Sequence, residues 1–383
     1  MNQLESKDIN IIGFPFTKIG RGVVSLNIFR ALKAAGFPPR VCDLSSKKTI
    51  RDKKIENELS SFLIHAPDGK INIFVINGDQ IESTQELIGK YPQDSYNIIY
   101  PAWELSDYPD GWLEKFKFFN EVWVPSKFMK SSLERKLQIP INLVHHPINT
   151  KVPYYQNRRY FGIKDNAYAF LFLFDFRSYI ERKNPFGMIN AFEQLCLMNL
   201  YQDIQAVIKV SGGDRYSKAG NDYLKFLNQI KGNHIKERIL LIDKELTEIE
   251  IRNLIRCTDC FVSLHRSEGF GLGLAEAMSL GKPVIGTGYS GNLDFMNDEN
   301  SFLVDFDLVP VKQDEYPFSE NQFWAEPNLD QAIDYMDNLV KNPDLGIKIG
   351  EISRLHIQKA FSYLSVGLQM KSRLSQIVLK TTN

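Results

Sequence analysis

The chain has 383 residues, and its 46 Lys and Arg balance 46 Asp and Glu, so its formal net charge is zero. A length of about two domains, with 43% hydrophobic and 12% aromatic residues, excludes a chain that is disordered throughout. The balanced charge argues against a protein that mainly coats nucleic acid or an anionic membrane, and we expect no nucleic-acid partner.

The N-terminus lacks the apolar core of a secretion signal. The longest apolar stretch, 167–176, is interrupted by Asp175 and falls far short of the roughly 20 residues of a spanning helix. We therefore expect a cytoplasmic protein whose membrane contact, if its acceptor is lipid-linked, is peripheral and at the inner face.

Short apolar runs alternate with longer helical patterns, which indicates parallel sheets wound with helices. The expected strands of the first half are 9–14, 71–76, 96–99 and 121–124, and its expected helices are 23–35, 112–119 and 127–137. After a linker at 145–164 the alternation restarts, with expected strands at 167–174, 205–210, 238–242, 260–264 and 282–286. The segment 355–380 is expected to be helical. We predict an α/β protein with two Rossmann-like, doubly wound domains that face each other across a cleft.

Cysteines at four positions suit a reducing compartment. Cys257 and Cys260 have the spacing of a redox or zinc half-site, but no second pair completes a zinc site. The alternative, which we favour, is two buried or half-buried thiols where a helix meets a strand.

The segment 263–291 carries the most informative motif. An expected strand ends near residue 264, a glycine-rich loop follows, and a helix begins near Leu272. Glycines at a helix N-terminus let the backbone bind an anion such as a diphosphate. Glu268 and Glu276 flank this loop, and carboxylates beside an anion site are suited to accept hydrogen bonds from sugar or ribose hydroxyls. The alternative is a simple turn with solvated glutamates.

Glu268-x7-Glu276, followed by the sequence GKPVI from Gly281, resembles the donor-site signature of the family 4 retaining glycosyltransferases of GT-B fold. The resemblance covers nearly the whole chain. It implies that Glu276 holds the ribose hydroxyls and that Glu268 contacts the donor sugar. It also implies domains 1–160 for the acceptor and 161–355 for the donor, with a helix at 356–383 that returns to complete the first. The backbone of the loop would hold sugar and phosphate through Gly269, Phe270, Gly271 and Leu272.

A second cluster follows the strand expected near residue 174. The carboxyl end of a parallel strand faces the ligand, so Arg177 and Lys183 could neutralise charge that develops on a departing nucleotide diphosphate. The family resemblance implies an Arg and a Lys about six residues apart that clamp the diphosphate, and here 183 − 177 = 6. Solvated surface cations are the alternative, and we expect Arg182 to be structural or exposed. We predict Arg177, Lys183 and Glu268 as the catalytic residues.

The weaker donor-site candidates share a place just after an expected strand. A tight turn remains the alternative for the glycine loops, and His145 and His146, before the linker's first proline, are expected to be structural. The weaker candidates are Gly20, Gly22, Ser211, Gly212 and His265, with Tyr289 as a sugar or acceptor contact.

The segment 100–133 combines aromatic rings with acids, as sugar subsites do. Trp103, Glu104 and Asp107 are therefore acceptor or sugar-binding candidates, whereas Trp103 and Trp112 could instead be core anchors. This stretch resembles a subset of the same family, with a Trp-Glu-Leu segment, that acts in bacterial surface-polysaccharide assembly. The chain lacks the histidine with which other relatives touch the donor sugar in this region.

The resemblance implies transfer of a hexosyl group, with retention, from a GDP-, UDP- or dTDP-hexose to a hydroxyl of a glycan, lipid-linked or protein-linked acceptor. No Asp-x-Asp run is placed to bridge a metal to the diphosphate, so we predict no metal and no cofactor. The main alternative is a non-catalytic nucleotide-sugar-binding partner of an active glycosyltransferase. A phosphorylase or a sugar-nucleotide epimerase is a weaker one.

Overall fold

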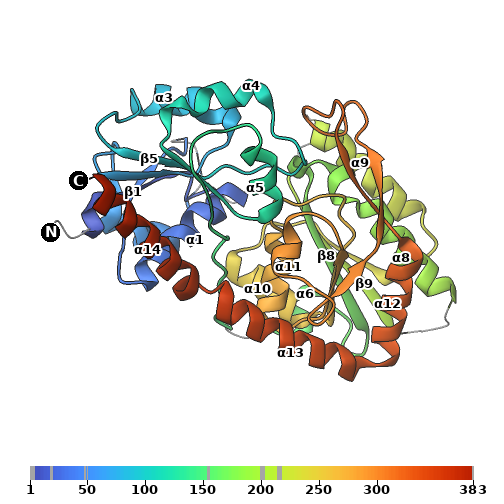
Figure 1. Cartoon of the computed structure of the whole chain (residues 1–383). Coiled ribbons are helices and arrows are strands. Elements are labelled where there is room, and N and C mark those ends of the chain that lie inside the picture. Colours follow the sequence, from blue (N-terminus) through green and yellow to red (C-terminus); the bar gives the residue numbers. More distant parts are fainter. Residues whose placement is uncertain are drawn as a thin grey trace. The chain divides into compact units, whose positions relative to one another are not determined.

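The computed structural model describes residues 5–17, 20–46, 49, 51–152, 156–198, 203–213 and 218–381. The chain forms two compact units, Met1–Asn149 with Lys359–Asn383, and Thr150–Gln358 (Figure 1). Each unit is built on a parallel sheet with helices, which confirms the predicted class of two doubly wound domains. The expected linker includes residues 153–155, which lie outside the described residues.

The first unit has a seven-stranded sheet in the order β3-β2-β1-β4-β5-β6-β7. Its central strands are buried along their whole length, as expected where helices cover both faces of a parallel sheet. The strands are β1 Ile9–Gly13, β2 Arg40–Asp43, β3 Leu63–Ile64, β4 Ile71–Phe74, β5 Tyr96–Ile99, β6 Glu121–Val124 and β7 Ile141–Leu143.

Helices α1 and α14 pack side by side in this unit (Figure 1). They approach closely because Gly367 faces Ala31: a Cβ on Gly367 would lie 2.0 Å from the Ala31 carbonyl oxygen. The Tyr363 hydroxyl also donates to Asn27 Oδ1 at 2.7 Å. The helices of the unit are α1 Gly20–Ala34, α2 Lys53–Leu59, α3 Ile81–Ile88, α4 Asp110–Leu113, α5 Lys127–Glu134 and α14 Tyr363–Thr381.

The second unit has a six-stranded parallel sheet in the order β10-β9-β8-β11-β12-β13, and a separate antiparallel hairpin, β14-β15. Its helices are α6 Arg158–Phe161, α7 Ile180–Lys183, α8 Pro185–Met198, α9 Lys218–Gly232, α10 Glu248–Cys257, α11 Leu272–Ser279, α12 Leu329–Lys341 and α13 Pro343–Ala360. Its strands are β8 Tyr168–Asp175, β9 Ile204–Ser211, β10 Ile239–Ile242, β11 Cys260–Ser263, β12 Val284–Thr287, β13 Phe302–Val304, β14 Phe306–Pro310 and β15 Phe323–Pro327.

Two helix predictions differ from the structure. The helix expected at 112–119 is one α-helical turn, α4, followed by a 3-10 segment, Glu114–Phe118. The helical pattern expected from residue 355 begins earlier, because α13 starts at Pro343. Proline is favourable at the first helical position, where its missing N–H has no partner to lose.

The unit boundary after Asn149 precedes the domain limit expected at residue 160. Arg158 explains why this segment belongs to the second unit. Its Nη2 lies 2.7 Å from both carboxylate oxygens of Asp259, and its Nη1 donates to the Ala167 carbonyl at 2.6 Å.

The structural roles expected for two cysteines and two histidines are confirmed. Cys257 ends α10 and Cys260 begins β11; both are buried and unpaired by disulfide. His146 is buried, its Nδ1 lies 2.9 Å from the Tyr100 hydroxyl, and burial lowers its pKa to about 3. His145 Nδ1 lies 2.9 Å from the Pro125 carbonyl oxygen.

Candidate functional site

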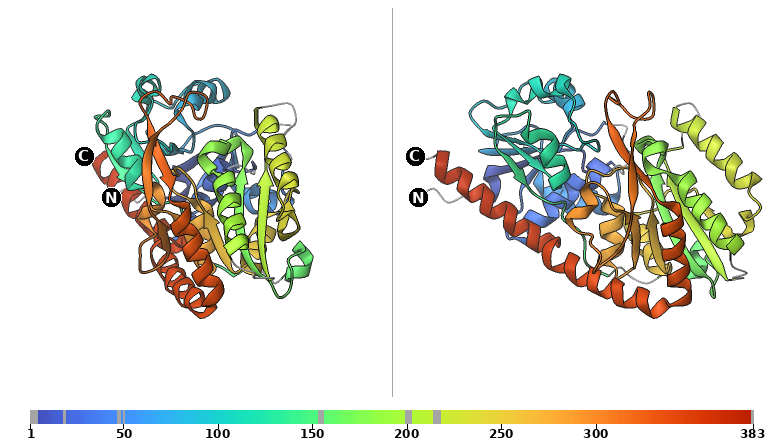
Figure 2. Two further views of the ribbon diagram at one scale, coloured as in Figure 1. Left: turned by 90° about the vertical axis from the view of Figure 1, so that its right-hand side faces the viewer. Right: turned by 45° about the vertical axis from the view of Figure 1, so that its right-hand side comes forward.

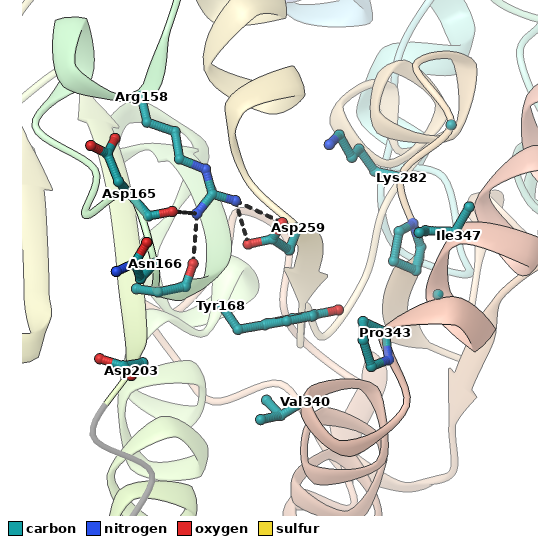
Figure 3. Close-up of a pocket in the computed structure, with 14 residues that line it drawn as sticks. Arg158, Asp165, Asn166, Tyr168, Asp203, Asp259, Lys282, Val340, Pro343 and Ile347 are labelled. Atoms are coloured by element: carbon teal, nitrogen blue, oxygen red, sulfur yellow. Dashed lines mark hydrogen bonds and ion pairs between the residues drawn. The ribbon is translucent and has the colours of Figure 1, made fainter.

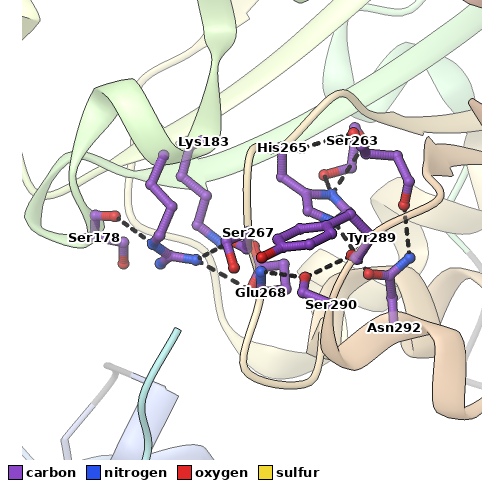
Figure 4. A network of polar contacts seen from close by, with 11 residues as sticks. Ser178, Lys183, Ser263, His265, Ser267, Glu268, Tyr289, Ser290 and Asn292 are labelled. Atoms are coloured by element: carbon purple, nitrogen blue, oxygen red, sulfur yellow. Dashed lines mark hydrogen bonds and ion pairs between the residues drawn. The ribbon is translucent and has the colours of Figure 1, made fainter. Parts of the chain in front are cut away.

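The candidate site of the second unit lies where its strand order reverses. β8 pairs with β9 on one side and with β11 on the other, so the chain winds away from this point in both directions. Ligands of doubly wound sheets bind outside the carboxyl ends of the strands at such a switch point. The loops after β8 and β11 carry Lys183 and Glu268, and the structure brings these two predicted residues together (Figure 4).

Glu268 is a buried carboxylate held by two cations. Lys183 Nζ donates to its Oε1, and Arg182 Nη1 lies 3.3 Å from its Oε2. Burial alone would raise the pKa of Glu268, but Lys183 and Arg182 outweigh it and lower that pKa to about 2. Glu268 is therefore an anion, able to accept hydrogen bonds, at any physiological pH.

Arg182 is the structural residue that the sequence allowed, and it is not exposed. Its Nη1 donates to the Ser267 carbonyl at 2.8 Å and its Nε to the Ser178 carbonyl at 3.2 Å. Its contact with Glu268 was missed, although its place beside Lys183 in a loop after a strand was the available signal. Arg182 thereby ties the two loops of the site together.

Arg177 lies at the same edge but has another partner. Its Nη2 pairs with Asp175 Oδ2 at 2.5 Å, and its side chain is 51% exposed. Gly212, at the end of the neighbouring β9, packs against this pair: with φ 74°, its added Cβ would lie 2.3 Å from Asp175 Oδ1. The adjacent Ser211 Oγ accepts from Lys209 Nζ at 2.8 Å. Arg177 and Lys183 are thus held by different carboxylates.

The glycine loop leads into α11 through Gly271, the N-cap, whose φ of 94° favours glycine. The Phe270 ring packs 4.9 Å from the ring of Phe295, so a ligand of this loop would meet backbone rather than the phenyl group. Gly291 approaches the loop closely, since its added Cβ would lie 2.2 Å from the Gly269 carbonyl oxygen. Leu272 begins the helix and is half-buried.

Glu276 stands on α11, one turn after Leu272, and is half-buried. Burial raises its pKa to about 7, against the opposing attraction of Arg252. Within the described ranges, its carboxylate has no hydrogen bond or ion pair. The two glutamates therefore differ: Glu268 stays an anion, whereas Glu276 titrates near neutral pH.

His265 is fully buried, and both of its ring nitrogens have partners within the unit. Its Nε2 lies 3.1 Å from Asn292 Oδ1, its Nδ1 lies 3.1 Å from Ser263 Oγ, and burial lowers its pKa. The lowered pKa favours the neutral ring, and the contacts with Asn292 and Ser263 anchor the loop that follows β11.

The residues after β12 also reach the site. Tyr289 is half-buried, with its ring 5.1 Å from that of Phe306. Ser290 Oγ accepts a hydrogen bond from the Glu268 backbone N–H at 2.8 Å. Ser290 was not predicted as a site residue, although it follows directly on Tyr289, which the sequence offered as a sugar or acceptor contact.

Two candidates of the first unit, Gly20 and Gly22, follow β1, where the strand order of that unit reverses between β1 and β4. Gly22 is required by packing, because an added Cβ would lie 2.0 Å from the Thr17 carbonyl oxygen, whereas Gly20 has open space. The loop between them and β1 includes residues 18 and 19, which fall outside the described residues. Arg21 has a buried Nη1 without a hydrogen-bond partner in the described structure, and it attracts Asp79 and Glu104.

The candidates of the segment 100–133 fall into one buried residue and two less buried ones. Trp103 is buried, its Nε1 donates to the Asp107 carbonyl at 2.8 Å, and its ring lies 5.4 Å from that of Trp112. This is the geometry of a core anchor. The Asp107 carboxylate is exposed and pairs with Lys136 at 2.7 Å, and Glu104 is half-buried.

A pocket of about 500 Å³ lies at the opposite, amino edge of the second sheet (Figure 3). Arg158, Tyr168, Asp259 and Lys282 contribute to its walls, and none of the predicted site residues does. In the ranges that the structure describes, no group of three or more His, Cys, Asp or Glu side chains is placed to hold a metal, and no helix has the length and apolar character needed to cross a membrane.

Comparison with known proteins identifies relatives of the whole fold. Residues 157–355, just over half of the chain, match the family described as Glycosyl transferases group 1. Sucrose-phosphate synthase of Thermosynechococcus elongatus superposes with a TM-score of 0.73 at 15% identity, covering 98% of this chain and 100% of that one. Anabaena HepE in complex with UDP and glucose superposes with a TM-score of 0.68 at 13% identity, covering 96% and 99%.

A relative by sequence is the N-acetyl-alpha-D-glucosaminyl L-malate synthase of Bacillus anthracis, 24% identical over 157 residues. The match spans 41% of this chain and 37% of that relative. At these identities the likeness to the solved structures shows the fold, which is GT-B.

Proposed function

The chain belongs to the glycosyl transferases group 1 family, and on that premise we propose that it transfers a hexosyl group from a nucleotide-diphosphate sugar to a hydroxyl acceptor, with retention of anomeric configuration. The observation that carries the proposal is the hydrogen-bonded ion pair between Lys183 and Glu268 at the switch point of the second sheet. In this pair the ammonium of Lys183 would bind the diphosphate, and the carboxylate of Glu268 would accept hydrogen bonds from the sugar.

The donor would bind along the carboxyl edge of this sheet. Glu276 would accept hydrogen bonds from the ribose hydroxyls, and Glu268 from hydroxyls of the sugar. The backbone of Gly269–Leu272 at the start of α11 would hold sugar and phosphate, with Gly212 beside Arg177 on the neighbouring strand. HepE was solved with UDP and with UDP-glucose, which supports a UDP-hexose as the first donor to test, before GDP- and dTDP-hexoses.

In the reaction, the bond between the anomeric carbon and the β-phosphate oxygen breaks, and a bond to the acceptor oxygen forms on the same face. The acceptor proton leaves with the diphosphate. Arg177 and Lys183 stabilise the negative charge that develops on the diphosphate as it departs. Lys183 carries three N–H donors, so it can contact Glu268 and the diphosphate at once. These two cations supply the neutralisation that a bridging divalent metal would otherwise supply, and we propose a metal-independent reaction.

The acceptor would be bound by the first unit, a glycan or a lipid-linked or protein-linked hydroxyl. Glu104 and Asp107 are its candidate contacts, since Trp103 packs in the core. Gly20 and Gly22 open α1 at the switch point of that unit and would face the donor phosphates or the acceptor. The Trp-Glu-Leu segment supports membership of the subset that assembles bacterial surface polysaccharides.

The test begins with thermal unfolding in the presence of UDP, GDP, dTDP or ADP, then of the matching nucleotide sugars, with and without EDTA. A ligand that binds the folded state raises the melting temperature. We expect a selective rise with one diphosphate that EDTA does not remove, followed by turnover with its hexose. Binding without turnover across a panel of glycan and lipid-linked acceptors would instead support a non-catalytic partner. NMR of the product's anomeric proton tests retention.

A further inference from the structure

The hairpin β14-β15 was not expected from the sequence, and it lies at the edge that carries the candidate donor site. Its strands pair antiparallel, with Phe306 opposite Pro327 and Pro310 opposite Phe323. β14 follows directly on β13, whose Val304 pairs with Thr287 at the carboxyl end of β12. The hairpin therefore starts at the carboxyl edge of the sheet, the edge that carries Lys183 and Glu268, and it extends away from the sheet (orange in Figure 2).

Arg266 joins this hairpin to both loops of the candidate site. Its Nε and Nη2 both lie 2.7 Å from Glu326 Oε2, in β15. Its Nη1 donates to the Glu181 carbonyl at 2.6 Å, and its backbone N–H donates to the Arg182 carbonyl at 2.7 Å. One residue, two positions before Glu268, thus fixes the backbone immediately before Lys183.

The ion pair between Arg266 and Glu326 is more than a solvated surface contact. The guanidinium lies over the ring of the buried Trp324, 5.7 Å from its centroid, and the Ala325 N–H donates to the Arg266 carbonyl at 2.9 Å. Packing against an aromatic face and hydrogen bonds to fixed carbonyls restrict the side chain to one orientation.

The hairpin also supports a strained residue of the same loop. Tyr179 has φ 64° and ψ 113°, a conformation that is costly for a residue with a side chain, and its ring lies 4.7 Å from that of Tyr316. In the described part of the chain, the non-glycine residues with positive φ all fall in the loop after β8, at Ser290, or between β14 and β15. Such strain persists only where surrounding contacts hold it.

We infer that Arg266 is a positioning residue that, braced by Glu326 and Trp324 of the hairpin, holds the loop carrying Arg177 and Lys183 in the geometry that binds a diphosphate. This inference rests on the proposed donor site. If the loop is held in advance, the diphosphate does not have to order it on binding. Arg266 itself need not touch the ligand.

The experiment compares two ligands that differ by one phosphate. Wild-type protein is titrated calorimetrically with UMP and UDP, GMP and GDP, and dTMP and dTDP, and the base with the largest preference for the diphosphate is used for the variants. The variants are Arg266→Lys, Glu326→Gln and, as a matched control, Arg159→Met, which removes an exposed arginine of the same unit. Circular dichroism and thermal unfolding establish that each variant folds.

We expect Arg266→Lys and Glu326→Gln to lower the ratio of monophosphate Kd to diphosphate Kd by about three- to tenfold, while the monophosphate Kd changes less than about twofold. The control should leave both values unchanged. A ratio equal to that of wild type, or parallel weakening of both ligands, would overturn the role of Arg266. If wild type prefers no diphosphate over its monophosphate, the proposed donor site fails and the inference fails with it.

Discussion

Glu121, on the sixth strand of the first unit, is fully buried and is paired with Arg373 of α14, whose Nη2 lies 2.5 Å from its Oε2. Tyr96, Trp123 and Asn142 also donate to this carboxylate. A side chain of α14 therefore neutralises a buried charge on β6, the next-to-last strand of a sheet formed by residues 9–143.

Replacing Arg373 by Met should destabilise the first unit, because it leaves Glu121 as a buried charge without its cation. We expect the free energy of unfolding to fall by about 3 kcal/mol, measured by urea denaturation. The matched variant Arg354→Met removes an exposed pairing with Glu351 and should cost about 0–1 kcal/mol. If the two variants lowered the free energy of unfolding equally, the pairing of Arg373 with Glu121 would not be what stabilises the first unit.

Lys183→Ala should lower kcat by about 10²–10³-fold, because the departing diphosphate loses a positioned cation. Lys231→Ala, which removes an exposed lysine of α9, serves as the control and should retain wild-type turnover. Initial rates with saturating donor provide the measurement. Unchanged turnover in Lys183→Ala would remove this residue from the proposed mechanism.

Glu276→Gln should weaken nucleotide binding and yet stabilise the protein at alkaline pH. The folded-state pKa of about 7 lies above the ordinary value of 4.5, so the unfolded chain loses its proton first and stability falls as pH rises through this interval. Removing the carboxyl should therefore raise the free energy of unfolding by about 1–3 kcal/mol more at pH 8 than at pH 5. Urea denaturation at pH 5 and pH 8 measures the effect on stability, and titration with the nucleotide measures the effect on binding.

Glu276 in the wild-type protein should also give nucleotide binding a pH dependence. A carboxylate accepts two hydroxyl hydrogen bonds, whereas the protonated group accepts fewer, so affinity should rise as pH increases from 6 to 8. The Glu276→Gln variant should lose that dependence. An identical pH profile in the two proteins would mean that the ribose is bound elsewhere.

Glu104→Gln should raise the KM for the acceptor and leave the KM for the nucleotide sugar within about twofold, since the proposed ribose and sugar contacts and the Arg177–Lys183 clamp lie on the other unit. Asp107→Asn, which removes an exposed pairing with Lys136, tests the neighbouring candidate in the same assay. A rise confined to the donor KM would contradict the assignment of this segment to the acceptor.

Much of the candidate site in the second unit could be located from the sequence, because its residues follow local sequence signals. Helix caps that follow β8 and β10 have local sequence signatures of this kind: Asn184 Oδ1 accepts from the Gly187 N–H at 3.1 Å at the start of α8, and Thr247 forms a capping box with Glu250 at the start of α10. Strand ends and glycine spacing then placed Lys183 and Glu268 at one edge of the sheet.

Contacts between distant segments could not be predicted in this way. Arg182, Arg266 and Ser290 act through partners set by strand order, and that order is a tertiary property. The hairpin was missed because β14 is only five residues long, contains Asp307 and Pro310, and has no fully buried residue, so its sequence shows neither a long apolar run nor a regular alternation. The segment 112–119 shows the opposite error, since a helical apolar pattern was realised mainly as a 3-10 turn.

The second unit is one uninterrupted stretch of chain, whereas the first is made of two stretches that flank it. During synthesis the ribosome would deliver every residue of the second unit before it delivers Arg373 or Gly367. The second unit can thus fold while the first sheet still carries Glu121 without its cation and α1 without its packing partner α14. The unit whose translation begins first is therefore the last to complete its fold. Nascent chains halted before α14 should expose the surface of α1 that α14 covers, and chaperones should bind these chains.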